Sequence, residues 1–220
     1  GEERYRKEHT PELVSRLKEA GVNLLVTHYF KGFGLKGERE DMEMAETLIG
    51  LCHEQGIRVA GYVGDTFVSE TMLLEEPDAM SWCQRKADGS PVTYGGNLTY
   101  RLKWCRNNPA FPAYMKRVLR RGIEHGLDMI HFDNFLNKPE PKACRCPHCA
   151  SKFRAFVRAK FSVAELKQRL GFSDLTHVLP PTFTDPLYVC YGDDVIQNPL
   201  VQEWVDFRCQ TLADSLRDLV

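Results

Sequence analysis

The stretch Gly126-Leu-Asp-Met-Ile-His-Phe-Asp-Asn-Phe135 decides the fold class of this chain. Its apolar run ends at Asp133-Asn134, a pattern typical of a strand buried on both faces of a parallel sheet. Side chains alternate along a strand, so His131 and Asp133 are expected on the same face. A carboxylate just beyond such a strand lies where α/β barrels and open α/β sheets hold their catalytic groups. The alternative is that Asp133-Asn134 is only a turn or a helix cap.

Helix and strand patterns alternate three times up to this stretch. Helical patterns over 10–20, 38–55 and 109–125 are each followed by an apolar strand pattern, over 22–26, 57–63 and 127–132. This alternation indicates βα units in a parallel sheet. The segment 67–106 is rich in turn residues and is expected to be a long irregular insertion, which is usually functional. Helical patterns over 151–160, over 163–170 and from 199 onward add no further strand.

All three predicted strands end in polar or aromatic residues. The carboxyl ends of parallel strands meet at one edge of a sheet, so these side chains are expected to form one rim. Aromatic rings and carboxylates together suit a sugar, whose C–H faces stack on rings while its hydroxyls bond to acids and histidines. The candidate substrate-binding residues are His28, Tyr29, Tyr62, Asp65, His131 and Asn134, with Asp133 as the candidate catalytic residue.

A glycine-rich loop follows the first predicted strand. Gly32-Phe-Gly34-Leu-Lys-Gly37 spells the dinucleotide-binding fingerprint, but the next helix begins Glu38-Arg-Glu40-Asp41. Carboxylates clustered at a helix N-terminus would repel the pyrophosphate that this motif binds. We therefore predict a flexible loop on the substrate side rather than a nucleotide site.

Three cysteines fall within six residues, at Cys144-x-Cys146-x-x-Cys149. Their thiolates can share one metal ion, and tetrahedral zinc needs a fourth ligand from His148 or a distant cysteine. Four protein ligands would leave no open position, so the zinc would be structural and would hold the loop in place. The alternatives are free thiols or a redox Cys-x-x-Cys pair.

Charge and hydropathy limit the partners. A formal net charge of −1 and a pI of about 6.7 give no electrostatic reason to expect nucleic acid or an anionic membrane. No apolar run approaches the ~20 residues of a membrane span, and no signal peptide is recognised. The chain starts at Gly1 and stops within a helical pattern, so we expect a fragment or a processed chain. A cytoplasmic location is favoured unless it is a trimmed secreted protein, and self-association to a homo-oligomer stays open.

Three segments together resemble a known family. Cys105-Arg-Asn107-Asn-Pro109-Ala-Phe-Pro-Ala-Tyr114, the strand end Asp133-Asn134 and Cys144-x-Cys146-x-x-Cys149-Ala-Ser-Lys-Phe153 are similar to glycoside hydrolase family 42. The resemblance implies a β-galactosidase-type (β/α)8 barrel and nominates Cys105 as the fourth zinc ligand. Such a barrel takes about 250 residues, so residues 1–220 would form one truncated barrel domain. The segments 67–106 and 136–150 would be insertions in it.

One departure from the family bears on function. The family has Asn-Glu at the end of its fourth strand, and its Glu is the general acid/base, whereas this chain has Asn134-Phe135. Two hypotheses remain: a glycosidase acting on a β-galactoside or related glycoside through Asp133, or a non-catalytic carbohydrate-binding or scaffolding relic. We favour the enzyme, because Asp133 and His131 occupy positions that inert packing residues could fill in a protein without catalytic function.

Overall fold

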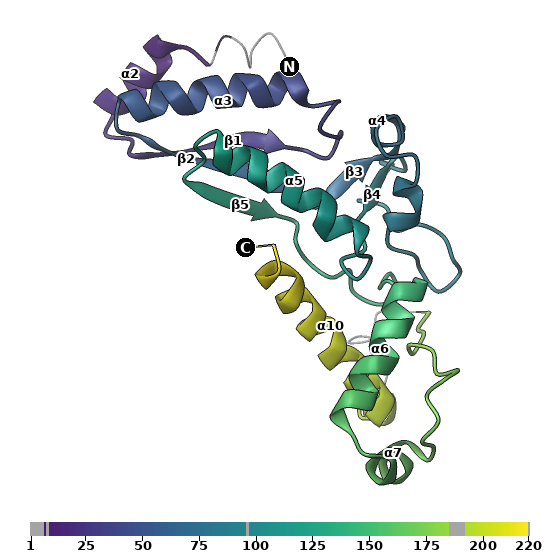
Figure 1. Cartoon of the computed structure of the whole chain (residues 1–220). Helices are drawn as coiled ribbons and strands as arrows, with labels where there is room; N and C mark the ends of the chain where they lie inside the picture. Colours follow the sequence, from purple (N-terminus) through teal and green to yellow (C-terminus); the bar gives the residue numbers. More distant parts are fainter. Residues whose placement is uncertain (1–6, 8, 96, 185–191, 220) are drawn as a thin grey trace. The chain divides into compact units, whose positions relative to one another are not determined.

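The computed structural model describes residues 7, 9–95, 97–184 and 192–219 of the chain (Figure 1). The chain divides into two compact units. The first comprises Gly1–Ser81, Tyr94–Leu102 and Ala113–Phe135, and the second Trp82–Thr93, Lys103–Pro112 and Leu136–Val220. Each unit is described by itself.

The first unit is built on a parallel three-stranded sheet. Strands β1 (Leu24–Phe30), β2 (Arg58–Gly64) and β5 (Met129–Asp133) lie in the order β1-β2-β5. Helices α2 (Pro11–Glu19), α3 (Arg39–Glu54) and α5 (Ala110–Glu124) alternate with them along the chain. The predicted α/β class with parallel strands is therefore confirmed, and the loop between β1 and α3 lies at the carboxyl edge of the sheet.

Helices α3 and α5 pack on the sheet face that carries Tyr29. The buried side of α3 consists of Met42, Ala45, Leu48, Ile49 and Cys52. The approach of α5 depends on two glycines, Gly61 on β2 and Gly122 on α5. A Cβ at Gly61 would lie 2.5 Å from Leu127 Cδ1, and a Cβ at Gly122 would lie 2.6 Å from the same methyl group. Leu127 thus fills the space that both glycines leave open.

The opposite face of the sheet is exposed within this unit. Val26 is 53% exposed and Met129 48%, and His28 and His131 are exposed as well. The prediction of a strand buried on both faces is therefore wrong for β5. In the described part of the unit, β5 has β2 as its single neighbour and helices cover one face alone. The strands also extend further than expected at their carboxyl ends, so His28 lies within β1.

The segment 67–106 is more regular than predicted. It contains or adjoins β3 (Thr66–Val68), α4 (Ser69–Met72), the 3-10 helix η1 (Ala79–Trp82) and β4 (Arg101–Lys103). Strands β3 and β4 pair in a two-stranded sheet. Elements of three or four residues are too short to show a hydrophobic period, which is why the sequence pattern did not indicate them.

The second unit is mainly helical. It contains α6 (Pro147–Lys160), α7 (Val163–Leu170), α9 (Asp193–Ile196) and α10 (Pro199–Arg217). A capping box at Ser162 starts α7, and Asn198 caps α10 with Pro199 at its first position. The core of this bundle comprises Ala143, Phe153, Val157, Leu166, Leu175, Trp204 and Phe207.

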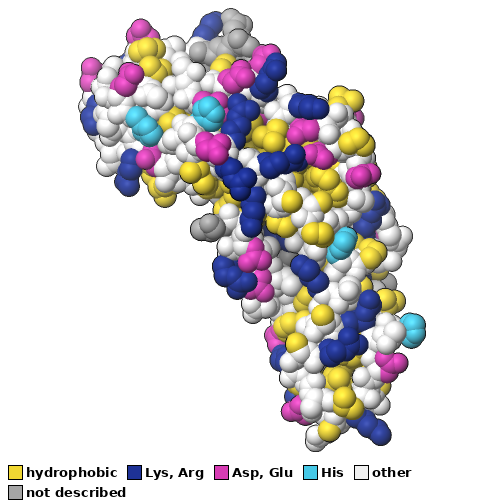
Figure 2. All heavy atoms as spheres, viewed as in Figure 1, with side chains coloured by type: hydrophobic (Ala, Val, Ile, Leu, Met, Phe, Trp, Pro, Cys, Tyr) yellow, Lys and Arg dark blue, Asp and Glu magenta, His cyan; other side chains and the backbone are white. Residues whose placement is uncertain are grey.

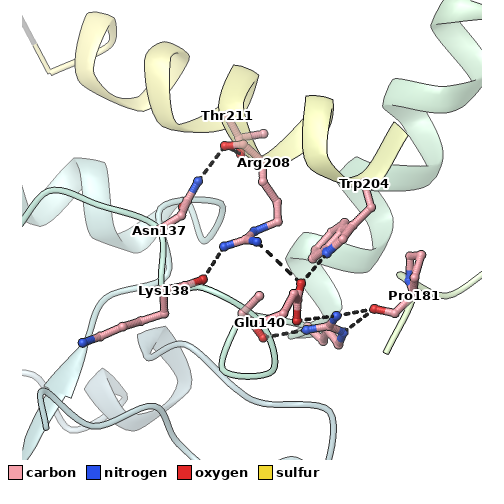
Figure 3. Close-up of polar contacts among 9 residues, drawn as sticks. Asn137, Lys138, Glu140, Pro181, Trp204, Arg208 and Thr211 are labelled. Atoms are coloured by element: carbon pink, nitrogen blue, oxygen red, sulfur yellow. Dashed lines mark hydrogen bonds and ion pairs between the residues drawn. The ribbon is translucent and has the colours of Figure 1, made fainter. Parts of the chain in front are cut away.

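A buried carboxylate joins α10 to the loop before α6 (Figure 3). Glu140 accepts hydrogen bonds from Trp204 Nε1 at 2.7 Å and from an Arg145 guanidinium nitrogen at 2.9 Å. Arg208 lies 3.5 Å from Glu140 and also donates to the Lys138 carbonyl. The side chains of Glu140 and Arg145 are 2% and 5% exposed, so each depends on the other to compensate a buried charge.

Acidic and basic side chains are interspersed on the face drawn in Figure 2, in keeping with the near-zero net charge. Among the described helices, none combines the length and the apolar character that a bilayer span requires.

Candidate functional site

Four cysteine sulfurs meet in the second unit. Cys105 Sγ lies 3.8, 3.4 and 3.6 Å from the sulfurs of Cys144, Cys146 and Cys149. All four sulfurs are within 4.8 Å of one another. A tetrahedron with metal–sulfur bonds of about 2.3 Å has edges of about 3.8 Å, so the four sulfurs fit a single zinc-sized ion. His148 is exposed and lies outside this group.

The local structure holds the sulfurs in place. Cys146 is the N-cap of α6, Pro147 occupies the first helical position, and Cys149 follows within the first turn. The helix begins four residues before the predicted start at residue 151, with Pro147 at its first position. The helix N-terminus favours negative charge on the sulfurs of Cys146 and Cys149.

Two further donors point at the cluster from outside it. The Asn107 side-chain amide donates to Cys149 Sγ at 3.3 Å, and the Arg85 backbone amide donates to Cys144 Sγ at 3.4 Å. Such outer hydrogen bonds orient thiolate ligands and stabilise their charge. Both contacts are of the kind found around the thiolate ligands of a metal ion.

Contacts within the cluster shift the pKa values of the cysteines in opposite directions. Hydrogen bonds from Cys105 lower the pKa of Cys144 and that of Cys146, while the same contacts raise the pKa of Cys105. If all four cysteines were thiolates, a cation would be needed to hold them this close together in a buried place. The donor set, the spacing and the burial therefore fit a bound metal ion, whose identity we take up below.

A second cluster lies on the exposed face of the three-stranded sheet. His28, Tyr62 and His131 occupy one register row across β1, β2 and β5. The ring of Tyr62 packs edge-on against His28 at 5.0 Å and stacks on His131 at 5.9 Å between centroids. Burial and the nearby Lys31 lower the pKa of His28, which favours its neutral form. Three rings thus form a continuous polar and aromatic strip.

The candidate catalytic carboxylate lies at the carboxyl end of this strip. Asp133 Oδ2 accepts a hydrogen bond from the Tyr62 hydroxyl at 2.5 Å and a second one from the Asn134 side-chain amide. Asn134 has a left-handed backbone (φ 59°), and its side-chain amide reaches the adjacent Asp133. Burial and the bond to Asp133 raise the pKa of Tyr62 to about 12, so the hydroxyl keeps its proton.

Two of the predicted rim residues lie elsewhere. Tyr29 is 1% exposed on the helix-covered face, where its hydroxyl donates to Glu46 at 3.1 Å. Asp65 is also 1% exposed. The structure therefore brings His28, Tyr62, His131, Asp133 and Asn134 together, and it does not place Tyr29 with them or expose Asp65 at a rim. Tyr29 follows His28 directly in β1, so strand alternation alone could have separated the two.

The glycine-rich loop 32–37 contains a feature that the sequence did not indicate. The carboxylate of Glu38 accepts hydrogen bonds from the backbone amides of Lys31 at 2.6 Å and of Gly32 and Phe33 at 2.7 Å. Its side chain therefore occupies the position where a phosphate would bind in a nucleotide-binding loop.

The rest of the same loop is held as well. The Leu35 amide donates to the Tyr114 hydroxyl at 2.8 Å, and the Lys36 amide donates to Glu75 at 2.9 Å. Five backbone amides, that of Lys31 and those of four loop residues, are thus bonded within the unit. The sequence predicts a flexible loop here, whereas these hydrogen bonds describe a fixed turn.

Comparison with known proteins rests on structure alone. No known family profile matches the chain, and no curated protein sequence matches it. Among solved structures, one similar chain is a polyextremophilic β-galactosidase from the Antarctic haloarchaeon Halorubrum lacusprofundi. It is 19% identical, with a TM-score of 0.70 over 96% of this chain and 32% of that one.

Two further solved structures resemble the whole chain. The catalytic domain of a β-amylase from Paenibacillus polymyxa is 12% identical, with a TM-score of 0.66 over 96% of this chain and 57% of that one. The α-L-fucosidase isoenzyme 2 from Paenibacillus thiaminolyticus is 14% identical, with a TM-score of 0.53 over 97% and 26%. This chain thus spans between a quarter and somewhat more than half the length of these proteins. At such low identity the likeness establishes the fold, an incomplete α/β barrel of the TIM type, as predicted.

Proposed function

We propose that this chain is part of a glycoside hydrolase acting on a β-galactoside or a related glycoside, with Asp133 as a catalytic carboxylate. The main observation in support is the arrangement at the carboxyl end of β5. There Asp133 accepts hydrogen bonds from Tyr62 and Asn134, beside the strip of aromatic rings. Catalytic groups of TIM barrels lie at this end of the strands. The similar structures named above, described as galactosidase, amylase and fucosidase, support the choice of a glycoside as substrate.

Hydrolysis of a glycoside places two requirements on this site. A sugar needs apolar faces to stack on and polar groups to orient its hydroxyls, which His28, Tyr62 and His131 supply together. Hydrolysis also needs two carboxyl groups flanking the glycosidic bond, and Asp133 supplies one. Glu140 is a poor choice for the second, because its oxygens accept from Trp204 and Arg145 in a buried place.

The test is hydrolysis of a panel of 4-nitrophenyl glycosides by the full chain and by Asp133→Asn. We expect the variant to lose turnover by a factor of about 10³ or more while its melting temperature stays close to that of the wild type. Asp128→Asn is the matched control, because Asp128 lies at the opposite end of the same strand, bonded to His53 and the Val59 amide. Unchanged turnover in Asp133→Asn would remove Asp133 from the mechanism.

One observation favours a second candidate, a carbohydrate-binding relic. Phe135 stands where the resembled family has its acid/base Glu, and its ring packs on Phe132 at 4.5 Å between centroids. Under this second candidate, an apolar contact would stand in the place of the proton donor. Under this hypothesis the wild type and Asp133→Asn would bind the same glycoside in calorimetry, and neither would hydrolyse any member of the panel.

We further propose that the four-cysteine cluster binds zinc in a structural role. Four thiolate ligands favour zinc over harder cations and leave no open position for substrate. Such a site would hold Cys105 and the α6 N-terminus together and would supply folding free energy. Elemental analysis of freshly purified protein should give about one zinc per chain, and protein free of zinc and of any other thiophilic metal would contradict the assignment.

A further inference from the structure

The contact between Tyr62 and Asp133 follows from the register of β2 and β5. Tyr62 pairs with His131, and Gly64, two residues further along, pairs with Asp133. Side chains two residues apart share a face, so Tyr62, the Gly64 position and Asp133 lie on the same side of the sheet. Gly64 has no side chain there, and the phenol of Tyr62 reaches past it to the carboxylate. A larger residue at Gly64 would stand close to this path, since its Cβ would lie 3.9 Å from Tyr62 Cε1.

Two hydrogen-bond donors fix the orientation of the Asp133 carboxylate. The Tyr62 hydroxyl and the Asn134 side-chain amide both donate to Oδ2. Within the described part of the chain, no hydrogen bond to Oδ1 is found. Oδ1 is therefore the oxygen that remains for a ligand at the carboxyl edge of the sheet.

We propose that Tyr62 is the positioning residue of Asp133, holding it as an oriented carboxylate that presents Oδ1 to the positive charge developing at the anomeric carbon. This inference rests on the proposed glycosidase function and refines it. It assigns Asp133 the part of the charged carboxylate and leaves proton donation to another group. It also moves Tyr62 from a direct sugar contact to a residue that acts through Asp133.

A structural role for Tyr62 would look different in experiment. A phenol that merely fills space would be replaced by Phe without effect, because its ring contacts with His28 and His131 are kept. A positioning phenol would change kcat and leave KM nearly unchanged. Tyr62→Phe is therefore the informative variant, and Tyr100→Phe is the control, since Tyr100 is 41% exposed.

The kinetic experiment measures kcat and KM of the full chain and both variants on the best glycoside of the panel. For Tyr62→Phe we expect kcat to fall about 10- to 100-fold, the value of one hydrogen bond to a charged group. KM should stay within about threefold, so that the loss falls on kcat. Tyr100→Phe should match the wild type in both respects.

A spectroscopic readout is independent of turnover. With ¹³Cζ-labelled tyrosine, the Tyr62 signal is identified by its absence in Tyr62→Phe, and it should shift in Asp133→Asn more than any other tyrosine signal. An unmoved Tyr62 signal, or a Tyr62→Phe variant with wild-type kcat, would overturn the role of Tyr62 alone. A wild type that hydrolyses no glycoside would instead overturn the proposed function, and the catalytic part of this inference with it.

Discussion

Replacing Glu38 by glutamine should change how the stability of this protein depends on pH. Glu38 is 2% exposed and accepts three backbone amides of the loop that follows β1. Burial raises the pKa of its carboxyl from 4.5 to about 7, while the three amides and Lys31 act in the opposite direction. The substitution keeps the shape of the side chain and removes its titration.

The sign and size follow from the two pKa values. A folded-state pKa above the unfolded one means that the contribution of Glu38 to stability is complete below pH 4.5 and is lost as pH rises through about 7. A difference of about 2.5 units at 1.36 kcal/mol per unit corresponds to about 3 kcal/mol. The unfolding free energy of Glu38→Gln, minus that of the wild type, should therefore rise by about 3 kcal/mol between pH 4.5 and pH 8.

The assay is urea unfolding of both proteins at half-unit intervals of pH, compared at constant m-value. Taking the difference removes the pH dependence of the other carboxyl groups. Glu43→Gln, at an exposed position on the same helix, is the control for the change from a carboxyl group to an amide. A flat or falling difference for Glu38→Gln would refute the reasoning, because it would mean that the three amide donors outweigh the cost of burying the charge.

Cys105→Ser should reduce the bound metal below one equivalent and lower the melting temperature, which parallel metal analysis and calorimetry would check; an unchanged metal content would count against Cys105 as a ligand. Gly32→Ala should cost about 3 kcal/mol or more in urea unfolding, because φ is +97° and a Cβ would lie 1.8 Å from the Thr66 carbonyl oxygen. Gly21→Ala is its control: φ is +82° with no atom within 4 Å, so about 1 kcal/mol is expected, and equal costs would exclude the steric explanation. Glu140→Ala should cost about 3–5 kcal/mol by leaving Arg145 buried without its carboxylate, and a loss under 1 kcal/mol would show that the pair is dispensable.

The elements of the first unit could be predicted where local signals were strong. Thr10 accepts from the Leu13 amide at the start of α2, and Gly126, with φ +97°, marks the turn from α5 toward β5, as the sequence pattern suggested. The burial of β5 could not be predicted in the same way, because an apolar run does not reveal how many neighbouring strands and helices will cover it. The short elements of 67–106 likewise have no period to detect.

The candidate site residues also differ in how far the sequence alone could indicate them. Spacing alone indicated Cys144, Cys146 and Cys149, whereas Cys105 is 39 residues from the first of them in sequence and was named through a family resemblance. Asp133 could be named as a strand-end carboxylate, but its bond to Tyr62 depends on the register of two strands 71 positions apart. The hydrogen bonds of Glu38 could not be predicted for a different reason. An acidic residue at this position argues against a bound phosphate, but it does not show that its own carboxylate accepts the backbone amides.

The two glycines that face Leu127 have a consequence for how this protein can diverge. One methyl group of Leu127 lies beneath both Gly61 and Gly122, so it cannot retreat from one without approaching the other. Substitutions at these three positions should therefore be correlated among homologous sequences, with alanine at either glycine position accompanied by a residue smaller than leucine at 127. A set of homologues in which the three positions vary independently would show that the spacing between α5 and the sheet is free to drift.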